Sequence, residues 1–320
     1  MDVKTSTFAM GSLPLVVEPK DVNAPSTTSL IDWIEGNSKW LDAKLLIHGG
    51  VLLRGFAVYE SAEFQQVAQS LIPELKPYVE GQSPRTKVID KVYTSTEYPA
   101  QYSITLHNEL SYAKAPPRRI IFYCHTPCPV GGETPISDFR KVCETMPPDL
   151  RLKFETLGVK YVKNMHASTN GLGKSWMDHF ETSDRDKVEG YLNENEIDYE
   201  WTPEGVLRTI SIRPGVFQHP ETEEKHWFNQ ANLWHVSNFD QRRRNQLLRL
   251  CGEENLPTHA YFGDGTPITD EELNEVRKVM WDNAISFRWE RGDVLLLDNY
   301  LVAHGRNPYE GPRKILVAMG

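Results

Sequence analysis

The amino-acid sequence predicts an α+β protein built on an antiparallel barrel or sandwich. β-Prone runs lie near both ends of the chain and helical patterns lie mostly between them. No regular alternation of strand and helix indicates a parallel sheet. The chain contains neither a G-x-G-x-x-G segment nor a Walker loop, so no residues support a nucleotide-binding fold.

Composition sets the broad class of the protein. The 320 residues are 39% hydrophobic and 25% charged, which excludes a disordered chain, a collagen and a coiled coil. No apolar run approaches the roughly 18 residues of a membrane helix, and no secretory signal is recognisable. The net charge of −9 argues against nucleic acid as a partner. Four cysteines are too few for a disulfide framework. We therefore expect a cytoplasmic protein with a small-molecule substrate; a homo-oligomer stays open.

Elements of the first half follow from periodicity and turn residues. Residues 1–27 are expected to form an N-terminal arm or a short edge strand. Helical spacing marks residues 28–46 and 61–72, the second helix capped by Ser61 and ended by Pro73. Residues 51–56, 102–110 and 120–125 are β-prone.

The second half continues in the same terms. Residues 138–200 are expected to be mainly helical, with Ser183 and Asp186 as a capping box for a helix over 184–195. Strands are predicted at 205–235, 285–290, 293–297 and 313–319, and helices at 239–251 and 270–281, the latter opened by Thr269 and Glu272. We expect one domain over 1–320, with residues 137–205 as a helical insert that includes a lid.

Three histidines are followed two positions later by a carboxylate residue, a spacing at which both side chains of a strand point the same way. With 10 histidines and 44 acidic residues in 320, about one such pair is expected by chance. The pairs are His107 with Glu109, His179 with Glu181, and His219 with Glu221. His219 and Glu221 lie in a polar turn, so a solvated loop is the simpler interpretation of that pair. His179 and Glu181 lie just before a helix cap, so a structural role is the simpler interpretation there.

His107 and Glu109 differ from the other pairs because they lie on the alternating segment 102–110. One face of that segment carries Ser, Thr, His and Glu, and the other carries Tyr102, Ile104 and Leu106. A strand with one apolar and one polar face suits the inside of a polar barrel. This context favours metal ligation by His107 and Glu109.

A third ligand should come from a distant strand. Two histidines and one carboxylate on one side of a metal form the facial triad of non-haem Fe(II) oxygenases. His304 fits because it follows the apolar run 294–297 and precedes the run 315–319. His235 competes, although it precedes an arginine-rich helix and not a strand. The same donors with a water also describe a zinc-dependent hydrolase, and a non-catalytic metabolite-binding protein is a further alternative.

The chain resembles the TauD/TfdA family of Fe(II)/2-oxoglutarate-dependent dioxygenases, particularly its clavaminate-synthase-like branch. The resemblance covers about residues 45–320, and its strength lies in the order of several short motifs. These are Leu53-Arg54-Gly55-Phe56, Leu106-His107-Asn108-Glu109, Gly131-Gly132-Glu133-Thr134, Trp227-Phe228-Asn229, Gly292-Asp293 to Asp298-Asn299, and His304-Gly305-Arg306 followed by Gly311-Pro312-Arg313.

The resemblance implies a double-stranded β-helix, or jelly-roll, core with surrounding and inserted helices. It implies His107, Glu109 and His304 as the catalytic residues that bind Fe(II). It also implies 2-oxoglutarate as cosubstrate, with Thr134 and Arg313 binding the carboxylate far from the metal, and O2 as oxidant. An arginine side chain offers a planar fork that matches a carboxylate.

Substrate positions follow from the same resemblance. Relatives contact substrate at positions that correspond here to Ser103, Leu110, Tyr112 and Trp227. Some relatives hold an anionic substrate with an arginine where this chain has Val317. Arg85 and Arg208 are the candidates for that role here, although surface or structural ion pairs are the simpler interpretation of both.

The reaction implied is hydroxylation of an unactivated C–H bond of a small polar, amino-acid-like or natural-product molecule, with release of succinate and CO2. Desaturation, epoxidation and ring closure use the same chemistry and stay as alternatives. Glu109 disfavours the halogenase variant, in which a small residue replaces the carboxylate so that chloride can bind.

Overall fold

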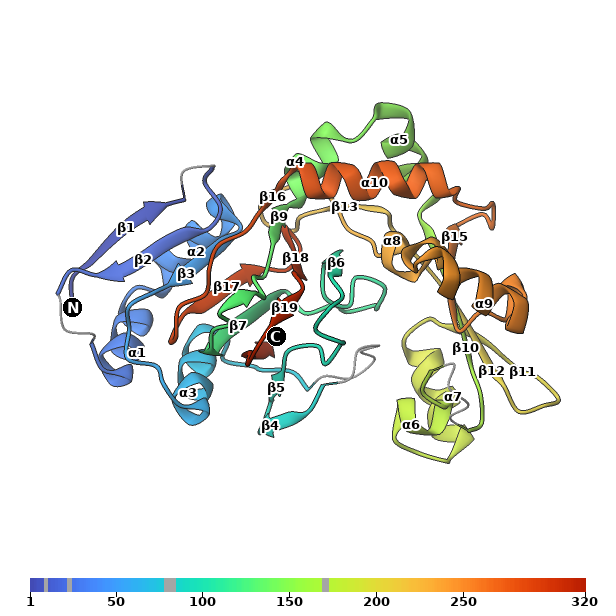
Figure 1. Ribbon diagram of the computed structural model, residues 1–320, viewed down its shortest axis with the longest axis horizontal. Helices are drawn as coiled ribbons and strands as arrows, with labels where there is room; N and C mark the ends of the chain where they lie inside the picture. Colours follow the sequence, from blue (N-terminus) through green and yellow to red (C-terminus); the bar gives the residue numbers. More distant parts are fainter. Residues whose placement is uncertain (9–10, 22–24, 78–84, 169–172) are drawn as a thin grey trace.

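The computed structural model describes residues 1–8, 11–21, 25–77, 85–168 and 173–320. Figure 1 shows two sheet-containing lobes. One lobe holds both ends of the chain and the other is formed by its middle, with α10 (Asp270–Asp282) along one side of both. Within the described residues, every helix is too short or too polar to cross a bilayer.

The larger sheet of the first lobe is covered by helices on its outer face. Its strands, in spatial order, are β1 (Val3–Thr7), β2 (Leu15–Pro19), β3 (Gly50–Leu53), β17 (Val294–Asp298), β7 (Arg119–Thr126), β20 (Lys314–Met319), β5 (Val92–Thr94) and β4 (Lys87–Ile89). The pairing of β2 with β3 is parallel and the other pairings are antiparallel. Helices α1 (Thr27–Gly36), α2 (Ser38–His48) and α3 (Ser61–Leu71) bury Leu30, Leu45 and Phe64 against this sheet.

A second sheet faces the inner side of the first. It consists of β16 (Ala284–Ile285), β9 (Ile136–Asp138), β18 (Val302–Arg306) and β6 (Ile104–His107), all antiparallel. Phe122, Leu297 and Val317 of the larger sheet pack with Ile136 and Val302 in the core between the two. A short pair, β8 (Val130–Gly131) and β19 (Tyr309–Glu310), lies beside them. The α+β class and the antiparallel sandwich agree with the prediction.

The second lobe is built on another antiparallel sheet. Its strands are β11 (Asp198–Trp201), β12 (Leu207–Arg213), β10 (Val159–Met165) and β15 (Thr258–Phe262), accompanied by the hairpin β13 (Val216–Gln218) and β14 (Lys225–Trp227). The remaining helices are α4 (Phe139–Thr145), α5 (Pro148–Leu157), α6 (Trp176–Phe180), α7 (Arg185–Glu194), α8 (Ala231–Trp234), η1 (Val236–Asn238), α9 (Gln241–Cys251) and η2 (Glu253–Asn255). Tyr161 and Phe262 pack against α4, α8 and α10, and Met165 and Leu207 pack against α6 and α7.

Several predicted elements need correction. Helices α4 to α7 lie within 138–200 as predicted, but the prediction missed β10 and β11, and β10 is an inner strand of the second-lobe sheet. The segment 1–27, predicted as an arm or a short edge strand, contains the edge strand β1 and also β2, and the helical segment 28–46 is two helices. The predicted strand 285–290 is reduced to β16. Asp184, not Ser183, caps α7, since its carboxylate accepts bonds from the Asp186 and Lys187 amides. Glu60, not Ser61, is the N-cap of α3.

The capping box of α10 forms as predicted. The Thr269 hydroxyl accepts a bond from the Glu272 amide at 3.1 Å, and the Glu272 carboxylate accepts one from the Thr269 amide at 2.8 Å. We expect Thr269→Ala to lower the free energy of unfolding by about 1 kcal/mol, because it leaves a helix-end amide without its acceptor. Urea unfolding would measure this. Thr269→Ser, which keeps the hydroxyl, should stay near wild type, and an equal loss in both variants would contradict the capping explanation.

Candidate metal centre

His107 and His304 lie directly opposite each other on adjacent antiparallel strands. Their backbones are register partners in the pairing of β6 with β18, although 197 positions separate them in the sequence. Side chains of opposed residues project from the same face of a sheet. The two imidazole rings accordingly lie with their centroids 4.5 Å apart.

Glu109 completes the cluster from outside the strand. Strand β6 ends at His107, and Leu110 has a left-handed backbone with φ of 53°. The Glu109 carboxylate reaches the histidines through this turn and not by strand alternation, so that part of the prediction was wrong. One potential ligand atom from each of the three residues lies within 4.8 Å of the others, and all three residues are buried. Among the described residues, no other set of three histidine, cysteine, aspartate or glutamate side chains has its potential ligand atoms so close together.

Both histidines are prepared to act as neutral ligands. Burial lowers the pKa of His107 and, more strongly, that of His304, so both rings are held in the neutral form that binds metals. The Nδ1 atom of His107 lies 2.8 Å from the Thr105 carbonyl oxygen, a bond that places the proton on Nδ1 and leaves Nε2 as the ligand atom. Two imidazoles and one carboxylate match the donor set that Fe(II) takes in oxygenases.

Arg85 contacts the carboxylate of this cluster. Its Nη2 atom lies 2.5 Å from Glu109 Oε2, and the two side chains are 2% and 6% exposed. The same Glu109 oxygen lies 3.8 Å from His304 Nε2. A guanidinium and an imidazole therefore both lie close to the same carboxylate oxygen of the candidate metal ligand.

The predicted cosubstrate residues line a cavity next to the histidines. His107, His304, Thr134, Arg85, Arg306 and Arg313 border it, and no acidic residue of the described chain does. Arg313 donates from Nε to the Gly132 carbonyl at 2.8 Å and from Nη1 to the Ser95 hydroxyl at 3.3 Å. Burial, with Arg306 nearby, lowers the pKa of Arg313 to about 10.

Arg313 therefore presents a positive charge that an anion would stabilise. Within the described residues it forms no ion pair with a carboxylate, and a desolvated charge without a counter-charge is costly. Gly132 allows its approach, since a Cβ there would lie 3.0 Å from Arg313 Cδ. The Thr134 hydroxyl accepts a bond from Trp289 Nε1 at 3.2 Å, so its own proton is available for a ligand oxygen. These groups fit a carboxylate of 2-oxoglutarate.

The proposed substrate residues are spread more widely. Ser103 is exposed just before β6, and Leu110 and Tyr112 follow Glu109 directly. Tyr112 contacts Tyr161 and Trp234 of the second lobe. Two residues lie deeper in that lobe: Trp227 is fully buried against Phe154, and Arg208 pairs in register with Asn164 and Glu200. Arg85 reaches the metal cluster, whereas Arg208 does not line its cavity.

The other histidines that the sequence analysis considered lie outside the metal cluster. His179 lies beside Lys163, with 3.3 Å between the amine and each ring nitrogen. His219 is fully buried and its Nε2 contacts Asp298 at 3.2 Å, so the predicted solvated loop was wrong at this residue. His235, the competing ligand, stacks on His259 with 4.4 Å between the ring centroids.

The stacked pair predicts a pH dependence of stability. Burial lowers the pKa of His235 to about 3 and that of His259 to about 4, whereas an unfolded histidine titrates near 6.5. Between pH 6.5 and 4 the unfolded chain binds protons that the folded chain does not, so the free energy of unfolding falls as pH falls. His259→Gln should make this slope shallower by at most about 1.4 kcal/mol per pH unit. Urea unfolding at several pH values would measure it, and an unchanged slope would contradict the assignment.

Some polar residues of the site were not predicted from the sequence. Ser95 contacts Arg313, and Trp289 contacts Thr134. Asn299 contacts the backbone of Glu109. Asn299 lies in the Asp298-Asn299 motif, which was the available signal. Nothing in the sequence marks Ser95 or Trp289, because their roles depend on pairing with residues far along the chain.

Comparison with known proteins identifies the family. The family described as "Taurine catabolism dioxygenase TauD, TfdA family" matches residues 15–319. Dapdiamide synthesis protein DdaC of Enterobacter agglomerans is 37% identical over 279 residues, 87% of this chain and 84% of that protein. A clavaminate synthase-like protein of Arabidopsis thaliana is 29% identical over 318 residues, 96% of this chain and 93% of that protein.

Solved structures confirm the jelly-roll fold. PvcB, titled an Fe, alpha-ketoglutarate dependent oxygenase from an isonitrile synthetic pathway, superposes with a TM-score of 0.56 at 15% identity, covering 99% of this chain and 90% of its own. AAD-2, solved with Mn(II) and N-oxalylglycine, gives a TM-score of 0.55 at 14% identity, covering 100% and 97%. The predicted Fe(II) and 2-oxoglutarate dependence is confirmed with the family. The chain belongs to the TauD/TfdA family and is an Fe(II)/2-oxoglutarate-dependent dioxygenase.

Proposed function

We propose that the chain binds Fe(II) through His107, Glu109 and His304 and hydroxylates an unactivated C–H bond of a small polar molecule. One observation carries this proposal: three buried ligand atoms converge within 4.8 Å. Beside them a cavity is lined by arginines and, among the described residues, by no acidic side chain.

Fe(II) and 2-oxoglutarate, when bound, supply the activation of O2 that oxidises the substrate, with release of succinate and CO2. The chain supplies geometry and environment. Strands β6 and β18 hold the two imidazoles on one face, and burial keeps them neutral. The Phe122 ring, 4.8 Å from that of His304, closes one side of the centre with an apolar surface.

Thr134 and Arg313 are proposed to bind the far carboxylate of 2-oxoglutarate. Arg313 is oriented by the Gly132 carbonyl and the Ser95 hydroxyl, and Thr134 by Trp289. Preorganised donors of this kind lose little freedom when the anion binds.

The substrate is proposed to carry an acidic group, as an amino-acid-like or natural-product molecule would. Arg85, Arg306 and Arg313 line the cavity, and with Fe(II) bound the positive charge there would exceed what Glu109 and one dicarboxylate neutralise. Arg85, already beside Glu109, is the proposed anchor, with Ser103, Leu110, Tyr112 and Trp227 as the further predicted contacts; Arg208 is the more distant alternative anchor. A relative named for dapdiamide synthesis supports a natural-product role.

Residues 137–205 are proposed to include the lid over this site. The segment after Glu109 links the metal centre to the second lobe, since Arg213 Nε donates to the Tyr112 carbonyl at 3.3 Å. Lys114 Nζ donates to the Glu194 carbonyl at 3.1 Å, at the end of α7. Movement of this lobe would thus reach the residues that follow the metal ligand.

Anaerobic titration with Fe(II) and 2-oxoglutarate tests the proposed centre. Chelation of the cosubstrate by bound iron should give a weak visible charge-transfer band, absent when either component is omitted. A folded protein that shows no band would overturn the ligand assignment. Glu181→Gln is the matched control for variants of Glu109, because Glu181 also follows a histidine by two positions but lies outside the cluster.

A screen of small molecules with and without an acidic group, read out as added succinate release, would then identify the substrate. Mass spectrometry of the product separates the reaction types: hydroxylation and epoxidation add one oxygen atom, whereas desaturation and oxidative ring closure remove two hydrogens. Stimulation only by molecules without an acidic group would contradict the proposed role of Arg85.

A further inference from the structure

The side chain of Asn299 holds both peptide groups of Glu109. Its Oδ1 atom accepts a bond from the Glu109 amide at 2.7 Å, and its Nδ2 atom donates to the Glu109 carbonyl at 2.9 Å. Nδ2 also donates to the Pro117 carbonyl at 2.8 Å. Asn299 has no exposed surface, so water does not compete for these bonds.

This contact lies where the strand no longer fixes the backbone. Strand β6 ends at His107, so the ladder with β18 does not extend to Glu109. The side-chain amide of Asn299 makes the two backbone hydrogen bonds to Glu109 that a neighbouring strand would otherwise make. The preceding residue is held in a similar way: Asn108 Nδ2 donates to the Asn299 carbonyl, and Gln230 Nε2 donates to the Asn108 carbonyl, both at 2.6 Å.

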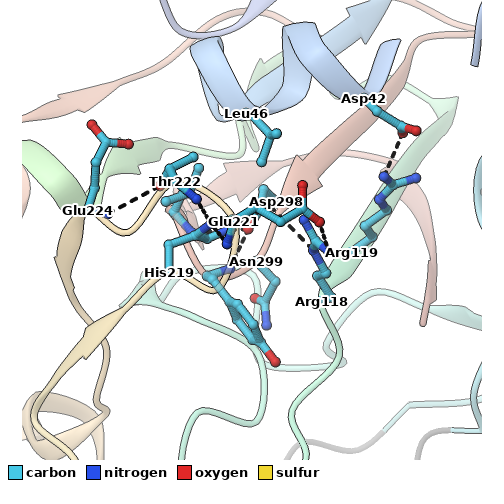
Figure 2. Close-up of polar contacts among 12 residues, drawn as sticks. Asp42, Leu46, Arg118, Arg119, His219, Glu221, Thr222, Glu224, Asp298 and Asn299 are labelled. Carbon is cyan, nitrogen blue, oxygen red and sulfur yellow. Dashed lines mark hydrogen bonds and ion pairs between the residues drawn. The ribbon is translucent and has the colours of Figure 1, made fainter. Parts of the chain in front are cut away.

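Asn299 itself lies among further polar contacts, and Figure 2 shows those around Asp298 and Asn299. Its amide donates to the Arg118 carbonyl at 2.8 Å. The neighbouring Asp298 carboxylate accepts bonds from the amides of Tyr300 and Leu301 and contacts His219 Nε2 at 3.2 Å.

The other contacts of His219 indicate the tautomer of its ring. Its Nδ1 atom accepts bonds from the amides of Glu221 and Thr222, so the proton lies on Nε2 and is donated to Asp298. Contacts to Arg118 and to His219 thus fix the turn that carries Asn299.

We propose that Asn299 is a positioning residue for the metal ligand Glu109. The amide pairs with the peptide of Glu109 and sets where the carboxylate lies relative to His107 and His304. This rests on the proposed role of Glu109 as a ligand. Losing a partner that orients a metal ligand typically weakens metal binding about 10- to 100-fold.

Calorimetric titration with Mn(II), without substrate or O2, tests this. Asn299→Ala should raise the Kd for Mn(II) about 10- to 100-fold relative to wild type. Asn164→Ala is the matched control. Asn164 is also a buried asparagine, and its Nδ2 donates to two backbone carbonyls, but in the second lobe. It should lower the unfolding temperature while leaving the Kd within about twofold of wild type.

A double-mutant cycle separates positioning from general support. If Asn299 acts through Glu109, then adding Asn299→Ala to Glu109→Ala should change the Kd by less than about twofold. Additive effects, or equal effects of Asn299→Ala and Asn164→Ala, would overturn the proposal. Asn299→Ser, whose hydroxyl is too short to bridge both peptide groups, is judged by the same criteria if the alanine variant does not fold.

The cycle also separates this inference from the proposed ligand set. If Glu109→Ala binds Mn(II) as tightly as wild type, both the ligand assignment and the role of Asn299 fail. If Glu109→Ala weakens binding and Asn299→Ala does not, only the positioning role fails.

Discussion

Replacing Glu109 with alanine is expected to weaken Fe(II) binding by more than about 100-fold, the upper range for losing a residue that only orients a ligand. Succinate release should fall to background. The variant loses the only anionic donor among the three candidate ligands, and it also leaves the buried guanidinium of Arg85 beside the centre without this carboxylate. Repulsion between that cation and the metal adds to the lost coordination.

Graded variants make this expectation sharper. Glu109→Gln keeps the shape and removes the charge, so it should approach the alanine variant. Glu109→Asp keeps the charge and should bind Fe(II) more tightly than either. Iron binding is measured by anaerobic titration and turnover by succinate release. If Glu109→Ala keeps wild-type iron binding and substrate-coupled succinate release, then Glu109 is not a ligand.

The two candidate histidine ligands could be predicted from local patterns, but their close approach to each other could not. The polar face of segment 102–110 singled out His107, and the apolar runs around His304 placed it on a strand. Their direct opposition depends on the pairing of β6 with β18 across most of the chain. Long-range register follows from tertiary packing, which a single sequence does not display.

Glu109 was proposed as a ligand for a partly wrong reason. The two-residue spacing suggested a shared strand face, yet the strand ends at His107 and a left-handed turn at Leu110 follows. Beyond the end of the strand pairing, hydrogen bonds from the Asn299 side chain hold the backbone of Glu109. The sequence showed Asp298-Asn299 as a motif, but it did not show that Asn299 contacts Glu109, which lies 190 positions away.

The sequence was least informative about which polar residues are buried and which partners they meet. His219 lies among polar residues in the sequence, which indicates a solvated turn, but the fold buries it against Asp298. Arg54 and Asp293 belong to separate motifs and meet in an ion pair with 2.6 Å between Nη2 and Oδ2. Each residue alone looks like a surface charge. Only the tertiary structure supplies the partner that makes burial tolerable.

Replacing Arg313 with glutamine is expected to raise the KM for 2-oxoglutarate at least about 30-fold, equivalent to ~2 kcal/mol, the lower range for losing one partner of a buried charge pair. The cavity would keep Thr134 but lose the charge aimed at the far carboxylate. Mn(II) binding without cosubstrate should stay unchanged, because Arg313 is not one of the three candidate metal ligands. Lys314→Gln is the matched control, a neighbouring cation that does not line the cavity, and it should keep the wild-type KM.

Cosubstrate analogues show whether Arg313 acts on that carboxylate. A 2-oxo acid that lacks the far carboxylate, such as 2-oxobutyrate, has nothing for the guanidinium to bind. Wild type should strongly prefer 2-oxoglutarate in competition assays of cosubstrate binding, and Arg313→Gln should lose most of that preference while binding 2-oxobutyrate about as well as wild type does. A variant that binds both acids less well by the same factor would show that Arg313 supports the cavity wall, since a structural defect does not distinguish ligands by their far ends.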